Sequence, residues 1–107
     1  MSIKIERELQ VIAKTGKMVF GSKSAIKNAK LGKAKMIIIS STIPEDIKAD
    51  IQYYSKLSRI PVIEFKGSSW DLGAVCGKPY MISAISILDF GESELQKLVE
   101  GDAKSQA

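Results

Sequence analysis

The chain has 107 residues, 45% of them hydrophobic and 26% charged, which predicts one globular domain with a core of its own and no room for a second. Its formal net charge of +4 is unevenly distributed, because residues 1–35 carry nine lysines and arginines against two glutamates, whereas residues 36–107 carry an excess of acidic residues. The single cysteine, Cys76, cannot form an internal disulfide. Because histidine is also absent, a metal site and a Cys-His nucleophile are not expected, which argues against many classes of enzyme.

The charge distribution and the cysteine count also bear on partner and compartment. A basic half indicates a polyanionic partner, although a lysine-rich helix face that is merely solvated explains it equally well. No apolar run approaches the roughly 18 residues of a membrane helix, and residues 1–4 lead into no secretory h-region, so no membrane partner is expected. The lone Cys76 predicts a reducing cytoplasm as the compartment.

The basic half predicts a helix, a strand and a second helix. Leu9 and Ile12 lie on one face of a first helix that ends at Gly16. Met18–Phe20 is typical of a short strand, and the second helix runs from Ser22 to Leu31. Three lysines are spaced four and three residues apart on one face of that helix; they are Lys23, Lys27 and Lys30.

The middle of the chain predicts two more strands with a helix between them. The continuous apolar run Lys35–Ile39 is typical of a central strand that is covered on both faces. Pro44 precedes acidic residues that suit the start of a helix, and Ile60–Phe65 predicts the next strand. The residues expected on the buried side of the helix are Ile47, Ile51, Tyr54 and Leu57.

A fourth helix, a fourth strand and a last helix complete the predicted order. Ser68 and Asp71 have the spacing of a capping box at the start of the fourth helix. A strand is expected from Met81 to Leu88, and a final amphipathic helix from Glu92 to Glu100. Strands and helices alternate throughout, so the fold class is predicted as α/β, with one domain over residues 1–100 and a polar tail over residues 101–107.

The turn at Gly21 is the first candidate binding site. Glycine lets the backbone approach a ligand closely, and the helix that follows offers unpaired N–H groups to an anion. Gly16 and Gly21 have the GxxxxG spacing of a P-loop, but Ser22 follows directly and Lys23 comes one residue later, so that motif is rejected. An anion site at the helix N-terminus and a plain strand-to-helix turn both remain open.

Two later segments are further candidates. Ser40-Ser41-Thr42 follows the central strand, where ligands bind in open α/β sheets, yet hydroxyl side chains form turns equally well. If the loop that carries Lys78 lies beside Gly21, then Tyr80-Met81-Ile82 would provide an apolar platform for an unstacked base. The alternative is that these residues begin the last strand.

Three remaining residues receive structural interpretations. Cys76 is expected to be a small buried hydrophobe, Asp71 to serve its helix cap, and Trp70 to pack either in the core or in a partly exposed position.

Several segments together resemble the family of ribosomal protein thirty from the large subunit of archaea and eukaryotes, over about residues 5–98. They are Phe20-Gly21-Ser22-Lys23-Ser24, Ala29-Lys30-Leu31-Gly32, Ala34-Lys35-Met36-Ile37-Ile38-Ile39, Asp50-Ile51-Gln52-Tyr53-Tyr54, Leu57-Ser58, Ile60-Pro61-Val62, Asp71-Leu72-Gly73 and Gly77-Lys78-Pro79. The resemblance implies a three-layer α/β/α sandwich with a mixed four-stranded sheet. It also implies three loops on one side that grip a kink-turn, a sharply bent RNA internal loop.

The resemblance assigns RNA-binding roles to residues of those three loops. They are Phe20, Gly21, Ser22, Lys23 and Lys27 in the first, Ser41 and Thr42 in the second, and Lys78, Tyr80, Met81 and Ile82 in the third. The sequence departs from the family at two positions. Thr42 stands where many members carry asparagine, and Met81 stands where some carry a basic residue.

The implied function is that of a non-enzymatic constituent of the large ribosomal subunit. Its expected partners are a ribosomal RNA kink-turn and neighbouring ribosomal proteins, with no cofactor and a monomeric state outside the ribosome. The alternatives are a kink-turn protein of a guide-RNA particle, against which Tyr53-Tyr54 and Leu57-Ser58 argue, a small enzyme acting on a phosphorylated ligand, and a module that binds an acidic protein.

Overall fold

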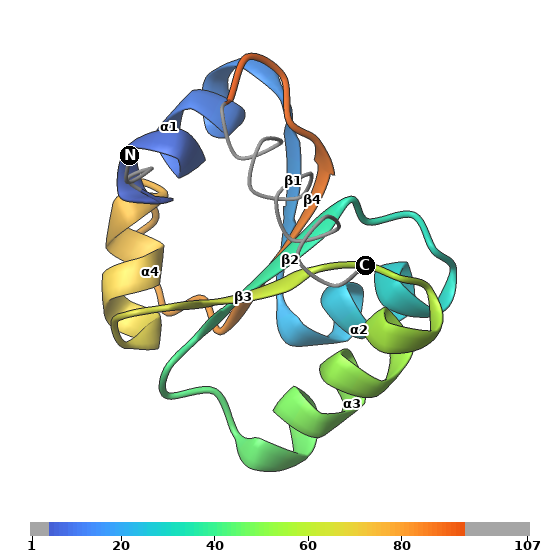
Figure 1. Ribbon diagram of the computed structural model, residues 1–107. Helices are drawn as coiled ribbons and strands as arrows, with labels where there is room; N and C mark the ends of the chain where they lie inside the picture. Colours follow the sequence, from blue (N-terminus) through green and yellow to red (C-terminus); the bar gives the residue numbers. More distant parts are fainter. Residues whose placement is uncertain (1–4, 94–107) are drawn as a thin grey trace.

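The computed structural model describes residues 5–93, which form alternating helices and strands (Figure 1). The helices are α1 (Ile5–Thr15), α2 (Ser22–Lys30), α3 (Glu45–Leu57) and α4 (Ser69–Val75), and the strands are β1 (Lys17–Phe20), β2 (Met36–Ser40), β3 (Val62–Phe65) and β4 (Ala84–Asp89). The predicted order is confirmed as far as the fourth strand. The helix expected over Glu92–Glu100 and the tail over residues 101–107 extend beyond the described residues.

The strands form one mixed sheet in the order β1-β4-β2-β3. β4 is antiparallel to both of its neighbours, β1 and β2, whereas β2 and β3 are parallel. β1, β2 and β3 therefore run in one direction and β4 runs in the other. As a consequence, the carboxyl ends of the first three strands and the amino end of β4 meet at the same edge of the sheet.

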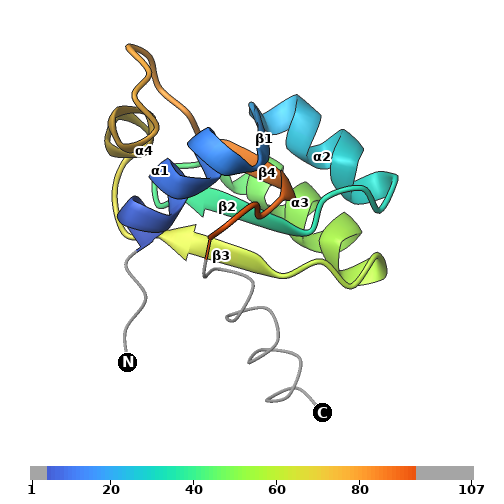
Figure 2. The ribbon, with the colours of Figure 1, turned by 90° about the horizontal axis from the view of Figure 1, so that it is seen from above.

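Helices cover both faces of this sheet, so the three-layer α/β/α architecture is confirmed. α1 and α4 lie over one face, and α2 and α3 lie over the other (Figures 1 and 2). Leu9, Ile12 and Leu72 belong to the core of the first face, whereas Ala25 and Ile51 belong to the core of the second. All of β2 is buried, as its continuous apolar run predicts. None of the described helices has the length and apolar character needed to cross a bilayer.

The start of α4 follows its local sequence. The Ser68 hydroxyl accepts a hydrogen bond from the Asp71 amide at 3.2 Å, and the Asp71 carboxylate accepts one from the Ser68 amide at 3.0 Å. The predicted capping box is therefore confirmed, and Asp71 serves its helix as expected.

Two predictions about element boundaries and burial are wrong. The last strand begins at Ala84 and not at Met81, because the preceding residues lie against α4, where the Ile82 amide donates to the Ser69 carbonyl at 3.0 Å. Leu57 is exposed and not buried. The buried residues of α3 are Ile51 and Ser55, which lie one turn apart. Leu57 comes two positions after Ser55 and therefore lies about 200° around the helix from it.

Candidate nucleic-acid interface

Four connections meet at the sheet edge described above, which we call the loop edge. They are the β1–α2 turn (Gly21), the β2–α3 loop (residues 41–44), the β3–α4 loop (residues 66–68) and the α4–β4 loop (residues 76–83). The first and last of these are adjacent, because the ammonium of Lys78 lies 5.3 Å from the centre of the Phe20 ring. The backbone amide of Ser40 donates to the Ser83 carbonyl at 2.9 Å, which joins the end of β2 to the α4–β4 loop. The amide of Ser41 donates to the Gly67 carbonyl at 3.0 Å, which joins the β2–α3 loop to the β3–α4 loop.

The β1–α2 turn leaves room for a ligand. Gly21 has φ +117°, a conformation that L side chains rarely adopt, and a Cβ at this position would meet nothing within 4 Å. Its amide is used internally, since it donates to the Ala84 carbonyl at 3.0 Å. No side chain caps α2, and its first turn contains no acidic residue. The first amides of α2 are therefore without an intrahelical acceptor, and residue 21 carries no side chain that could cover them.

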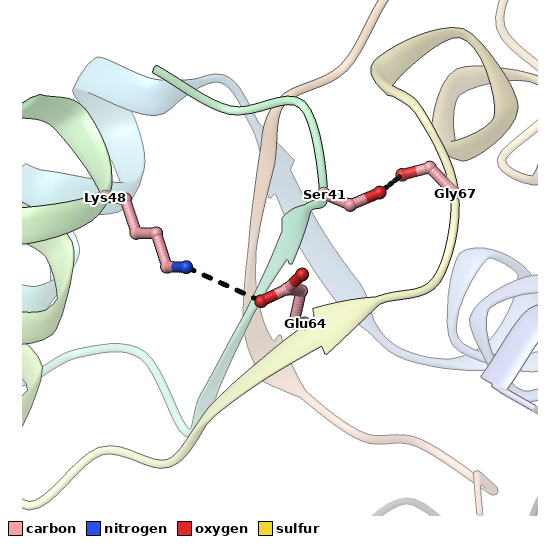
Figure 3. A network of polar contacts seen from close by, with 4 residues as sticks. All are labelled: Ser41, Lys48, Glu64 and Gly67. Atoms are coloured by element: carbon pink, nitrogen blue, oxygen red, sulfur yellow. Dashed lines mark hydrogen bonds and ion pairs between the residues drawn. The ribbon is translucent and has the colours of Figure 1, made fainter. Parts of the chain in front are cut away.

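Lysines on α2 extend this positive site. Lys23 and Lys27 are both exposed and lie one turn apart. Within residues 5–93 the recorded ion pair is Lys48 with Glu64 at 3.6 Å, on α3 and β3, and it involves neither α2 lysine (Figure 3). Lys30, in contrast, lies 4.8 Å above the ring of Tyr54. Lys23 and Lys27 are thus the α2 lysines that remain available to a phosphate.

The α4–β4 loop presents two apolar side chains to solvent. Tyr80 is 50% exposed and Met81 is 51% exposed, and both precede β4. This placement argues against the alternative that they simply begin the last strand. Ile82 is different, because only 2% of its surface is exposed and it packs in the core against α1 and α4. The predicted contact of Ile82 with a base is therefore corrected, since its side chain supports the loop from within.

The hydroxyl groups of the β2–α3 loop are committed to contacts within the protein. The Ser41 hydroxyl donates its proton to the Gly67 carbonyl at 2.6 Å (Figure 3). It therefore has no proton to give to a phosphate, which can only accept. The Thr42 hydroxyl accepts from the Ser69 amide at 3.0 Å and lies 3.1 Å from the Ser69 hydroxyl, so one of its three hydrogen-bonding positions is left for a base.

The β3–α4 loop also belongs to the loop edge, although sequence reasoning did not select it. Lys66 is exposed in this loop, and Trp70, in the first turn of α4, is 62% exposed. The expectation that Trp70 lies in the core is therefore wrong, whereas the alternative of a partly exposed position agrees with this value. The signal for Lys66 was available, because it follows a predicted strand in the same way that Ser41 does. Nothing in the sequence showed that Trp70 faces solvent, since its neighbours at helical spacing within α4, Gly73 and Ala74, are small.

Cys76 offers no reactive thiol to this surface. Burial raises the pKa of the half-buried thiol from its ordinary 9.0 to about 11, and the nearby Lys78 ammonium offsets only part of this effect. The thiol is therefore protonated at neutral pH. Among the described residues, no three side chains of the types that ligate metals gather closely enough to hold an ion.

Comparison with known proteins identifies what this architecture is similar to. The model of the ribosomal protein L7Ae/L30e/S12e/Gadd45 family matches residues 3–97. Over 98 residues the chain is 54% identical to the large ribosomal subunit protein eL30 of Saccharolobus solfataricus, a match that covers 92% of this chain and 91% of that protein. The protein of the same name from Methanothermobacter thermautotrophicus is 47% identical, with 89% and 97% covered.

A solved structure supports the fold alone. A protein of unknown function from Bacillus halodurans superimposes with a TM-score of 0.76 at 22% identity, covering 92% of this chain and 99% of that one.

Proposed function

Because the chain belongs to the ribosomal protein L7Ae/L30e/S12e/Gadd45 family, we propose that it is a structural, non-enzymatic constituent of the large ribosomal subunit that binds ribosomal RNA in the cytoplasm. Its archaeal relatives of 42–54% identity are named large ribosomal subunit protein eL30, and the match spans nearly their whole length. The resemblance to the ribosomal protein thirty family that the sequence motifs indicate is confirmed by these relatives.

The finer proposal is that the loop edge holds a kink-turn and that the protein acts as a monomer in doing so. The observation that carries it is the uncapped start of α2 behind Gly21, which lies beside an exposed aromatic loop. Amides at a helix N-terminus and the ammoniums of Lys23 and Lys27 suit phosphates. Tyr80 and Met81 offer an apolar surface to bases that have left the stack.

This pairing of surfaces favours a bent RNA over a regular duplex. In an A-form helix the bases are stacked and cannot reach an aromatic side chain, so only the lysines would find partners. In a sharply bent internal loop, unstacked bases and closely spaced phosphates are available together. The protein then stabilises the bent form of the RNA, because only that form gains both sets of contacts.

The alternatives differ in how the loop edge would be used. A kink-turn protein of a guide-RNA particle would employ the same surface, and the names of the relatives favour the ribosomal assignment. A small phosphate-ligand enzyme would need an activated group at the loop edge. The described residues there provide a protonated Cys76 thiol and the Ser68 hydroxyl, whose neighbouring Asp71 carboxylate also accepts the Ser68 amide in the helix cap. A module that binds an acidic protein would use the lysines, but this alternative gives no role to the exposed aromatic side chain of Tyr80.

Equilibrium binding to three RNAs tests the proposal. They are a kink-turn, the same RNA with its tandem sheared pairs destroyed, and a plain duplex, each measured across a salt series. We expect the kink-turn to bind at least tenfold more tightly than either control at every salt concentration. Equal affinity for all three would leave only a nonspecific basic surface and would overturn the kink-turn assignment. A stoichiometry at saturation of more than one protein per RNA would contradict the monomeric state.

A further inference from the structure

Ser69 is the buried centre of a group of four hydroxyls at the loop edge. Only 1% of its surface is exposed, and it is the first residue of α4. Its Oγ lies 2.8 Å from the Oγ of Ser40, 3.1 Å from the Oγ1 of Thr42 and 3.1 Å from the Oγ of Ser83. These partners come from the end of β2, the β2–α3 loop and the α4–β4 loop. We call the four residues the hydroxyl cluster.

The backbone of Ser69 makes contacts to the same two loops. Its amide donates to the Thr42 hydroxyl at 3.0 Å, and its carbonyl accepts from the Ile82 amide at 3.0 Å. The Ser40 amide donates to the Ser83 carbonyl at 2.9 Å, which closes the network. Every polar group of Ser69 therefore connects α4 to the β2–α3 loop or to the α4–β4 loop.

The hydroxyl cluster uses the full hydrogen-bonding capacity of the Ser69 side chain. A hydroxyl has one proton to donate and two positions that accept, and Ser69 has three hydroxyl neighbours. Removing it would leave the fully buried Ser40 hydroxyl without this partner. Burial strengthens the bond between Ser69 and Ser40 and raises the penalty for leaving either hydroxyl unpaired, whereas the contacts of Ser69 with Thr42 and Ser83 are part-buried.

We propose that Ser69 is a positioning residue for RNA binding. It fixes the β2–α3 loop and the α4–β4 loop relative to each other before RNA arrives. The exposed Tyr80 and Met81 are then held in place, so binding does not require these loops to be ordered first. The inference rests on the proposed function, but it assigns a role to a buried side chain that would not itself touch RNA.

Ser69→Ala tests this role against Ser86→Ala as a matched control. Ser86 is a fully buried serine on β4 whose hydroxyl has no hydrogen-bond partner among the described residues. Both variants delete one buried hydroxyl, but only the first breaks the hydroxyl cluster. With both variants fully folded, we expect Ser69→Ala to weaken kink-turn binding by about tenfold and Ser86→Ala to leave it within twofold of the unsubstituted protein.

Two further measurements separate positioning from a general loss of structure. The salt dependence of binding by Ser69→Ala should equal that of the unsubstituted protein, because the α2 lysines are untouched. In a double-mutant cycle, Ser83→Ala should add little to Ser69→Ala, because both remove the 3.1 Å contact between the Oγ atoms of Ser69 and Ser83. Additive losses, or affinity of Ser69→Ala within twofold of the unsubstituted protein, would overturn the proposal.

Amide hydrogen exchange of the RNA-free protein gives a readout that does not depend on the proposed function. Ser69→Ala should accelerate exchange in residues 41–44 and 78–83, and leave the first turn of α2 unchanged. If Ser69→Ala does not fold, Ser83→Ala removes one member of the cluster and should produce the same pattern in residues 78–83. Unchanged exchange in these loops would overturn the role of Ser69, whereas a failure of the unsubstituted protein to bind kink-turn RNA would overturn the proposed function alone.

Discussion

At the scale of single residues, two lysines with the same charge differ in the surface that they occupy. Lys23 lies in the first turn of α2 beside the loop edge, whereas Lys56 lies in the last turn of α3, at the opposite end of the sheet. Both are exposed. Each phosphate that a lysine neutralises releases counterions on binding. Removing one such lysine therefore lowers the slope of log affinity against log salt by a fixed amount.

Lys23→Ala should therefore weaken RNA binding and flatten the slope of log affinity against log salt by about one unit. Lys56→Ala is the matched control and should change neither. The measurement is the equilibrium dissociation constant at several salt concentrations. An unchanged slope for Lys23→Ala would remove this lysine from the proposed contacts.

Tyr80 and Ile82 are two residues apart but should respond oppositely to truncation. The half-exposed Tyr80 can stack on a base, and Tyr80→Ala should cost about 1–3 kcal/mol of binding while leaving the free energy of unfolding nearly unchanged. The buried Ile82 fills the core, and Ile82→Ala should cost about 2–5 kcal/mol of stability. Urea denaturation and RNA titration of both variants check this division. A large loss of stability in Tyr80→Ala, with binding intact, would place Tyr80 in the core.

The Cys76 thiol should be slow to react. Its pKa rises to about 11 because burial disfavours the thiolate, so the folded protein holds this proton more tightly than the unfolded chain does. The stability that the neutral thiol contributes is present below the unfolded pKa near 9.0 and is lost as pH rises through about 11. At pH 8, alkylation of the folded protein should be on the order of 100-fold slower than that of the unfolded chain. Equal rates would show that the thiol is not desolvated.

At the scale of elements, α4 and the loop that follows it are packed backbone to backbone. A Cβ at Gly73 would lie 2.0 Å from the carbonyl oxygen of Tyr80, a distance that no real contact tolerates. Glycine is therefore required at this position for the loop to lie against the helix. The same close packing carries the bond from the Ile82 amide to the Ser69 carbonyl.

Gly73→Ala should displace the α4–β4 loop and cost about 1–3 kcal/mol of stability. Because the loop carries Tyr80, the same substitution should weaken RNA binding, although residue 73 itself is buried. Ala74→Ser, at the next, exposed position of α4, is a control that should have neither effect. A Gly73→Ala variant with unchanged stability and affinity would show that the helix and loop separate freely.

The sequence predicts most elements because their signals are local. The apolar run of β2, the capping box of Ser68 and Asp71, and the Gly21 turn all depend on neighbours within a few residues. The start of β4 could not be predicted, because Ile82 has a strand-forming side chain and its backbone is bonded to α4 and not to the sheet. For the same reason, the commitment of the Thr42 hydroxyl to Ser69 was not visible, since these residues meet only in the folded chain.

At the scale of the whole molecule, the sheet topology assembles the loop edge. β1, β2 and β3 point their carboxyl ends to one side, and the antiparallel β4 brings the α4–β4 loop to the same side. The uncapped helix, the α2 lysines and the exposed aromatic loop are thereby gathered from distant parts of the chain. The excess of positive charge in residues 1–35 follows this arrangement, because those residues include the turn and helix that would face phosphates.

If the loop edge stabilises a bent RNA, the shape of the RNA should change when the protein binds. A kink-turn RNA labelled with a donor and an acceptor at its two helical ends reports bending as energy transfer, while anisotropy of the same sample reports binding. In buffer without divalent ions, where the free RNA is extended, we expect energy transfer to rise with protein and to saturate at one protein per RNA, in parallel with binding. Binding that saturates while energy transfer stays at the level of the extended RNA would contradict the account.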